Sequence, residues 1–345
     1  MRRALLFMAL ISMAVSCADA EPETPESLRL LSHDSFANEV TDQTFAAFTE
    51  ATGIEVEVIA GSDAGSMVNQ AILSKDNPLA DVIFGVDDTF LSRALEEGIF
   101  LDYESELSDQ IPEDLFRGAK GVATPIDYGD VCINYAKEWF ESTGTPVPTT
   151  LDQLRDSIYA GTLTVEHPAT SSPGLAFMLA TIVEYGEEGW LDFWDDLKAG
   201  GVEVVPDWDT AYYSEFVPYG GQSAMVVSYA SSPPAEVIFA TEPLDEAPTG
   251  VIEAGCYRQV EYAGILEGTA YPEAAGELID FMLSVEFQES IPLTWFVFPA
   301  NVDAGLPPEF IEHTTLPESP AQLDPDTIAE NRDRWIDEWV SVMEG

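Results

Sequence analysis

The decapeptide His167-Pro168-Ala169-Thr170-Ser171-Ser172-Pro173-Gly174-Leu175-Ala176 places three hydroxyl side chains directly before a proline that opens an apolar helix. Proline is favoured at the first helical position, and serine or threonine before it caps the free backbone N–H groups. Those N–H groups and the positive end of the helix dipole can hold an anion without a lysine or arginine. An ordinary capped helix is the alternative interpretation. The stretch predicts a connection from a strand into a helix, with room for a phosphate or another oxygen-rich ligand.

Short apolar strands alternate with helical patterns before this stretch. Strands are predicted over 28–31, 54–60 and 80–86, with helices over 36–52 and 65–75. This alternation is typical of an α/β fold, in which loops after the strands meet at one edge of the sheet and bind ligands. The polar loops expected at that edge are His33-Asp34-Ser35, Ser62-Asp63-Ala64-Gly65-Ser66 and Val86-Asp87-Asp88.

A second set of strands and helices follows residue 126. Its strands are predicted over 131–135, 162–166, 202–205 and 224–229. An extended stretch over 251–266 then carries the chain back, and helical periodicity resumes over 272–283. We therefore expect a hinge with two crossings. The expected lobes are 28–126 with about 264–300 (lobe 1) and 127–263 (lobe 2), while the pattern assigns the helical segment 301–345 to neither.

The N-terminus predicts export. Arg2 and Arg3 precede an apolar run over 4–15 that is too short for a permanent membrane span. Two cleavage sites within this leader (1–20) compete: one before Cys17, which would then be acylated, and one after Ala20. We favour the lipoprotein, held by a tether over 21–27 in the periplasm or at the outer face of the cytoplasmic membrane.

Two further cysteines, Cys132 and Cys256, could form a disulfide in an oxidising compartment. Both lie in apolar, strand-like runs, so a small buried hydrophobe is the alternative for each. The sequence has no Cys-x-x-Cys pair or cysteine–histidine cluster of the kind that binds structural zinc.

The charge of the chain excludes several classes of partner. Only 13 residues are basic and 63 are acidic, which gives a formal net charge of −50. Such a chain repels nucleic acid and anionic membrane surfaces, so we expect membrane contact only through the lipid anchor. The acids are dispersed, as on a solvated surface suited to a salty habitat. An apolar content of 46% is ample for the cores of two lobes.

Several aromatic residues lie at predicted strand ends beside small polar residues. Trp208 follows the strand over 202–205, Tyr229 ends the next strand, and Trp295 with Phe296 precedes Pro299. Aromatic faces in such places can stack against a flat or cationic ring. Four other tryptophans have helical spacing and are predicted to be core: Trp190, Trp194, Trp335 and Trp339.

In these and other motifs, the chain from Leu28 to the C-terminus resembles the periplasmic thiamine-binding proteins of bacterial ABC importers, within the group that also binds ferric iron and polyamines. The motifs are Asp34-Ser35-Phe36, Ala80–Asp87, Asp127-Tyr128-Gly129, Thr170–Leu175, Ser228–Pro233 and Arg334–Trp339. The resemblance implies an α/β, two-lobed periplasmic-binding-protein clamshell of type II. It also implies a monomeric, non-enzymatic receptor that binds thiamine or its phosphate esters, needs no cofactor or metal, and delivers its ligand to a permease dimer with a cytoplasmic ATPase.

The resemblance also implies a set of ligand-binding residues. Matched position by position, they are Asp63, Ala64, Ser171, Ser172, Trp208, Tyr229, Ala230, Ser231 and Ser232, to which we add His33, Asp34 and Trp295. The chain departs from the family at some of these places. His33 replaces a tyrosine, Ala64 a glycine and Ala235 an aromatic residue, and Trp295 is one position from the family's cleft tryptophan, which leaves Phe296 as the alternative.

Three alternative functions have to be weighed against the sequence features of this chain. Adjacent Tyr212 and Tyr213 suit ferric iron, and the many acids permit a polyamine. A secreted hydrolase is the alternative of another class, but the sequence has no Gly-x-Ser-x-Gly elbow, His-Glu-x-x-His motif or P-loop. Its three histidines, His33, His167 and His313, lie in unrelated contexts.

Overall fold

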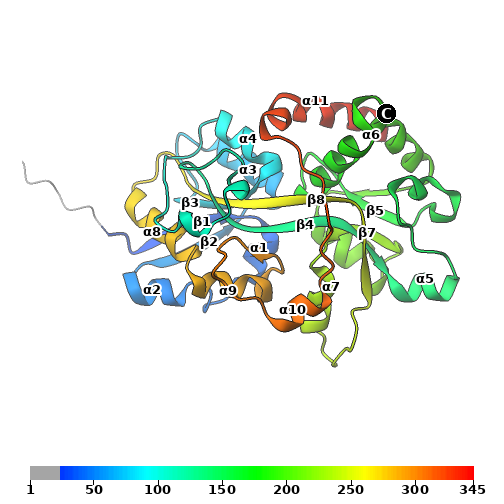
Figure 1. Ribbon diagram of the computed structural model, residues 1–345. Helices are drawn as coiled ribbons and strands as arrows, with labels where there is room; N and C mark the ends of the chain where they lie inside the picture. The colour runs from blue at the N-terminus through cyan, green and yellow to red at the C-terminus, as the bar shows by residue number, and fades with distance from the viewer. Residues whose placement is uncertain (1–23) are drawn as a thin grey trace, which may run out of the picture.

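Two long strands connect the halves of the molecule. β4 (Thr124–Ala136) and β8 (Thr249–Ile265) pair in antiparallel orientation, and in Figure 1 both run from one half into the other. The computed structural model describes residues 24–345. The predicted leader, both cleavage sites, Cys17 and the start of the tether lie outside the described residues.

Lobe 1 is built around the first three strands of the chain, which lie at one end of the sheet. Its strands β1 (Ser27–Ser32), β2 (Glu55–Ala60) and β3 (Val82–Asp87) are parallel. Its helices are α1 (Asp34–Glu39), α2 (Ala46–Thr52), α3 (Ala64–Leu73), α4 (Asp88–Glu96), α8 (Pro272–Met282) and α9 (Val285–Thr294), with short 3₁₀ turns at Ser108–Gln110 and Glu113–Phe116. Every residue of β3 is buried, as in a parallel strand covered on both faces.

Lobe 2 contains the strands β5 (Leu163–Glu166), β6 (Glu203–Val205) and β7 (Met225–Tyr229). Around them lie α5 (Lys137–Thr143), α6 (Ser172–Ala199), the π-helix η5 (Thr210–Glu215) and α7 (Ser232–Ile238), with 3₁₀ turns at Leu151–Arg155, Ser157–Tyr159 and Val217–Tyr219. The strands form one continuous sheet in the order β2-β1-β3-β8-β4-β7-β5-β6, and β9 (Phe298–Pro299) pairs with β4. The predicted α/β architecture with two crossings between lobes is therefore present.

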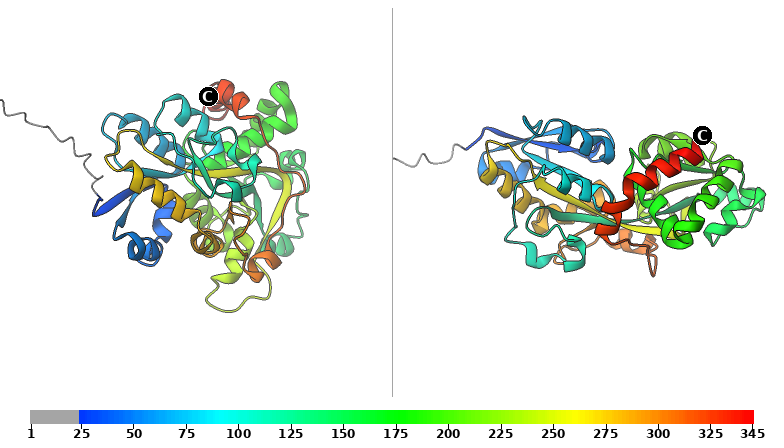
Figure 2. Two further views of the ribbon diagram at one scale, coloured as in Figure 1. Left: turned by 60° about the vertical axis from the view of Figure 1, so that its left-hand side comes forward. Right: turned by 90° about the horizontal axis from the view of Figure 1, so that it is seen from above.

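The C-terminal segment contributes to both lobes. It contains α10 (Pro308–His313) and α11 (Pro325–Met343), and α11 packs against α4 of lobe 1 and α6 of lobe 2. The Arg332 guanidinium lies 4.6 Å from the centre of the Phe90 ring, while the rings of Trp339 and Trp194 are 5.4 Å apart. Figure 2 shows α11 lying along lobe 2 with its first turn at the junction of the lobes. This helix therefore bridges the junction.

Two other predictions concern helices. Trp190, Trp194, Trp335 and Trp339 are fully buried, as their spacing predicted. The single helix predicted over 36–52 was wrong, because the chain is extended at Val40 and turns before α2 begins. The Thr44 hydroxyl accepts a hydrogen bond from the Thr41 N–H, a local bond that competes with a continuous helix. Within residues 24–345, no helix is both long and apolar enough to cross a membrane.

Candidate ligand-binding cleft

A cleft of about 1120 Å³ lies between the lobes. Lobe 1 lines it with the loops after β1 and β2 and with the end of α9, and lobe 2 with the start of α6, η5 and α7. Most of the residues predicted from the sequence lie on its wall: His33, Asp63, Ala64, Ser172, Trp208, Tyr229, Ser232 and Trp295. Ser171, Ala230 and Ser231 are buried and do not line it, and Asp34 is half-buried at the start of α1.

The starts of α3 and α6 face each other at the boundary between lobes. Asp63 caps α3, and its Oδ1 accepts a hydrogen bond of 2.7 Å from the Ala64 N–H. A Cβ atom on Gly65 would lie 2.8 Å from the Ala169 carbonyl oxygen, so glycine permits this close approach of the lobes. Two helix N-termini thus converge beside the cleft, an arrangement that favours a negatively charged group.

Protein groups already accept hydrogen bonds from two of the three hydroxyls at the start of α6, whereas the Ser171 hydroxyl is buried without a hydrogen-bond partner among the described residues. The Ser172 hydroxyl donates to the carboxylate of Asp87, and the Thr170 hydroxyl donates to the Pro206 carbonyl oxygen at 2.7 Å. Burial raises the pKa of Asp63 to about 6, although the Ala64 N–H and the Ser171 hydroxyl oppose that rise. An anionic ligand would therefore share this region with the carboxylates of Asp63 and Asp87.

A second group of ionisable side chains lies on the lobe 1 side. His33 Nε2 is 3.4 Å from Glu261 Oε1. Burial lowers the pKa of His33, but attraction to Glu261 and a hydrogen bond with it outweigh burial and leave the pKa raised. Asp127 accepts a hydrogen bond of 3.0 Å from Trp295 Nε1, and burial together with repulsion from Glu261 raises its pKa well above the usual range.

Sequence reasoning missed Glu261 as a site residue. It lies in the strand that crosses between the lobes, and its neighbours on that strand are buried. The only signal available was the presence of two carboxylates, Glu253 and Glu261, within the mostly apolar stretch 251–266. Glu236 was also missed, and it lines the cleft from α7.

Aromatic side chains cover the lobe 2 wall. The Trp208 ring stacks on Tyr212 with centroids 5.1 Å apart and planes at 18°. Its Nε1 donates to Ser228 Oγ at 2.9 Å, which fixes the ring orientation. Tyr229 lies beside it on the wall, and its hydroxyl is 3.3 Å from Gln259 Oε1. Trp208 is half-buried, and it lines the cleft.

The adjacent residues Tyr212 and Tyr213 differ in burial and in hydrogen bonding. The Tyr212 side chain is buried and its hydroxyl donates to Glu236 Oε1 at 2.6 Å, whereas Tyr213 is 48% exposed. Across residues 24–345 there is no group of three or more His, Cys, Asp or Glu side chains placed to hold a metal ion. The geometry does not support an iron site built on this pair.

The charge of the cleft is one-sided. Its acidic residues are Glu39, Asp63, Glu138, Glu236, Glu242 and Glu261. No lysine or arginine of the described chain lines it. Carboxylates whose one basic neighbour on the described cleft wall is His33 produce a negative potential, which attracts a cation into the cleft.

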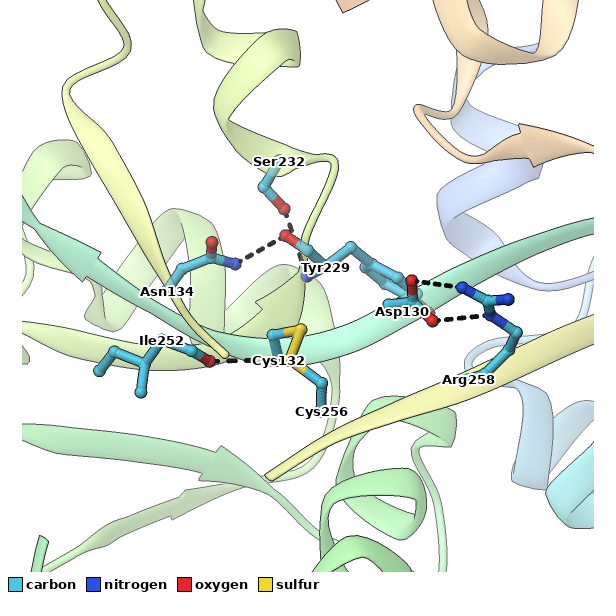
Figure 3. Close-up of a disulfide and its surroundings, with 8 residues drawn as sticks. All are labelled: Asp130, Cys132, Asn134, Tyr229, Ser232, Ile252, Cys256 and Arg258. Atoms are coloured by element: carbon cyan, nitrogen blue, oxygen red, sulfur yellow. Dashed lines mark hydrogen bonds and ion pairs between the residues drawn. A yellow bond between two sulfur atoms is a disulfide. The ribbon is translucent and has the colours of Figure 1, made fainter. Parts of the chain in front are cut away.

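A disulfide lies directly behind the Tyr229–Ser232 segment (Figure 3). Cys132 of β4 and Cys256 of β8 form it, and both pack against Ala230. The Ala230 N–H donates to the Asp130 carbonyl oxygen at 2.8 Å, and Asn134 Nδ2 donates to the Tyr229 carbonyl oxygen at 3.0 Å. These contacts fix one wall of the cleft to the strands that connect the lobes.

Comparison with known proteins gives consistent results. The family described as bacterial extracellular solute-binding protein matches residues 77–318. The thiamine-binding periplasmic protein of Salmonella typhimurium is 28% identical over 339 residues, which cover 98% of each chain. A solved structure titled periplasmic thiamin binding protein has a TM-score of 0.80 at 27% identity, with 92% of this chain and 96% of that chain covered.

Iron-bound HitA from Pseudomonas aeruginosa has a TM-score of 0.74 at 20% identity, with 92% of this chain and 99% of that chain covered. At this identity the likeness concerns the fold alone. The expected periplasmic-binding-protein fold is thereby confirmed, and the ligand has to be argued from the cleft.

Proposed function

Because the chain belongs to the bacterial extracellular solute-binding protein family, we propose that the solute it binds in the interlobe cleft is thiamine, with thiamine phosphate esters as further ligands. The chain is a binding protein and not an enzyme, and it serves an ABC transporter whose permease and ATPase are its partners. Two relatives whose names include thiamine binding support this ligand, and their similarity extends over nearly the whole chain.

One observation carries the proposal: a half-buried tryptophan, Trp208, lines a cleft that contains carboxylates and, among the described residues, no basic side chain other than His33. Thiamine joins a flat aminopyrimidine to a permanently cationic thiazolium. A cation over the face of tryptophan is attracted by the ring and by nearby carboxylates. Trp208 and Tyr229 would contact the rings, while Asp63 and Glu261 would offset the positive charge.

The hydroxyethyl end, or its phosphate ester, would point toward the starts of α3 and α6. Backbone N–H groups at helix N-termini are suited to phosphate. The carboxylates of Asp63 and Asp87 lie in the same region and oppose a second anion there. The relative affinity for thiamine and its phosphate esters therefore shows whether attraction by the helix N-termini or repulsion by the two carboxylates is stronger.

Ligand binding would act by stabilising the closed arrangement of the lobes. A ligand that contacts both lobes shifts the population toward the closed form, which then docks on the permease. The lobe boundaries proposed near residues 126 and 264 lie within β4 and β8, the strands that would bend. We also propose that Cys17 carries a lipid anchor and that the receptor is a monomer.

Calorimetric titration of the mature domain tests the ligand. Thiamine, thiamine monophosphate and thiamine diphosphate are the ligands, and ferric citrate and spermidine are the controls. We expect tight one-to-one binding of a thiamine species and no chemical change in it. No heat with any thiamine species, together with binding of a control, would reject thiamine as the solute while leaving the binding-protein fold intact.

A further inference from the structure

Two phenylalanines from different lobes touch beside the cleft. Phe239 directly follows α7 of lobe 2, and Phe296 lies just past the end of α9 of lobe 1. Their ring centroids are 4.9 Å apart with planes at 75°, the edge-to-face arrangement that aromatic pairs favour. Both line the cleft, and Phe239 is still 55% exposed. A large apolar ring with this exposure has part of its surface available to a ligand or to the other lobe.

The backbone of Phe296 is in the left-handed region, with φ of 62°. It follows the last residues of α9, and its N–H donates to the Ile291 carbonyl oxygen at 3.3 Å. Glycine is the residue favoured at this kind of helix end, and a bulky side chain there is strained. Strained residues persist where the surrounding structure holds them, and they are concentrated at functional sites.

The same turn directs two neighbouring aromatic rings differently. Trp295 donates from Nε1 to Asp127, and its ring meets Phe36 at 4.8 Å in lobe 1. Phe296 instead meets lobe 2. The left-handed conformation thus separates a ring anchored in its own lobe from one that reaches across the cleft.

On the lobe 2 side of the contact, a neighbouring helix and a backbone hydrogen bond hold α7 and Phe239 in place. α10 packs against α7, and the Phe239 N–H donates to the Ala235 carbonyl oxygen at 3.0 Å. Ala235 and Phe239 both line the cleft and lie one helical turn apart, on the same face of the helix. The small side chain of Ala235 leaves the Phe239 ring as the main apolar group of this face.

We propose that Phe239 and Phe296 form an aromatic clamp that joins the two lobes across the cleft and retains a flat ligand there. The contact between the lobes is inferred from the positions of Phe239 and Phe296 alone. The choice of thiamine as the probe rests on the proposed function. When the rings meet, they cover the bound ligand and exclude water from one side of it. When they separate, the ligand can leave.

Ligand release measures the clamp directly. Thiamine dissociation is followed by stopped-flow fluorescence for the natural sequence, Phe239→Ala and Phe296→Gly. We expect release to be faster by at least about fivefold in both variants, with association rates within about twofold. Phe239→Tyr keeps an aromatic ring and should restore slow release. The control is Ile311→Ala, an exposed residue of α10 that does not line the cleft, and it should change neither rate.

Phe296→Gly separates this function from a structural role. Glycine relieves the strain at φ of 62°, so this variant should melt at the same or a higher temperature than the natural sequence while releasing ligand faster. Unchanged release in folded Phe239→Ala and Phe296→Gly would overturn the clamp. An equal acceleration in Ile311→Ala would also overturn it.

A measurement without ligand tests the clamp independently of thiamine. Small-angle X-ray scattering gives the radius of gyration of the ligand-free chain, which should rise in Phe239→Ala and stay constant in Ile311→Ala. Equal radii in all three chains would contradict a contact that holds the lobes together. If the natural sequence fails to bind thiamine, the proposed function fails, and this comparison still decides the clamp.

Discussion

The Ser172 hydroxyl donates a hydrogen bond to the buried carboxylate of Asp87, and this bond connects the start of α6 in lobe 2 to the end of β3 in lobe 1. Asp87 also accepts from the Thr89 N–H at 2.7 Å and caps α4. Burial raises the pKa of Asp87, and these hydrogen bonds oppose the rise. The Asp87 carboxyl group is therefore held by the second lobe as well as by its own.

Replacing Ser172 with alanine should destabilise the protein by about 2 kcal/mol, the usual contribution of a hydrogen bond to a charged group. Loss of the hydroxyl raises the pKa of Asp87 further, so the cost should be greater at high pH, where Asp87 is ionised, and smaller in acid. Urea unfolding at a series of pH values measures it. Ser341→Ala is the control, because Ser341 is exposed and its hydroxyl bonds only to its own helix at Asp337. Equal losses in the two variants would contradict the link.

Trp208→Ala should weaken thiamine binding at least about fivefold, which corresponds to roughly 1 kcal/mol for a cation stacked on tryptophan. Trp208→Phe keeps a ring on Tyr212 and should lose less affinity. Calorimetry gives both affinities, and circular dichroism checks that the variants are folded. An alanine variant that is folded and binds as tightly as the natural sequence would remove Trp208 from the site.

The fold could be predicted largely from local patterns. Alternating apolar strands and helices indicated an α/β body, and helical spacing placed Trp190, Trp194, Trp335 and Trp339 in the core, where they are buried. The long extended stretch that became β8 indicated a return crossing. These features depend on neighbours within one strand or helix, which is the range over which sequence periodicity is informative.

The cleft was less predictable because its wall depends on long-range geometry. Glu261 faces the cleft because of its register in β8, and Phe296 does so because of one left-handed backbone angle. Neither is visible in a local pattern, and phenylalanine itself disfavours that angle. Likewise, no pattern within α11 indicates that it packs on both lobes.

Binding of a cation should weaken as the pH falls through about 6. Asp63 has its pKa raised to about 6, so its carboxylate is mostly ionised at pH 7.5 and mostly neutral at pH 5. If thiamine binds the ionised form, affinity should fall about tenfold between these values. The groups that influence the pKa of Asp63 are the Ala64 N–H, Ser171, His33 and Asp34. Protonation of His33, whose pKa is also raised, acts in the same direction because it adds positive charge.

Asp63→Asn separates these two contributions. It should bind thiamine more weakly at pH 7.5 and show a smaller pH dependence, with the remainder due to His33. Titrations at several pH values give the slope for each chain. The same slope in the natural sequence and in Asp63→Asn would exclude Asp63 as the group that responds to pH.

The Cys132–Cys256 disulfide should stabilise the protein by about 3 kcal/mol. It joins β4 to β8 across a sequence separation of 124 residues, so it restricts a large part of the unfolded chain. The double variant Cys132→Ala/Cys256→Ala should unfold at a correspondingly lower urea concentration. Dithiothreitol should destabilise the natural sequence and leave the double variant unchanged. Two free thiols in a mature domain that lacks Cys17, or an unfolding curve indifferent to the reductant, would contradict the bond as a source of stability.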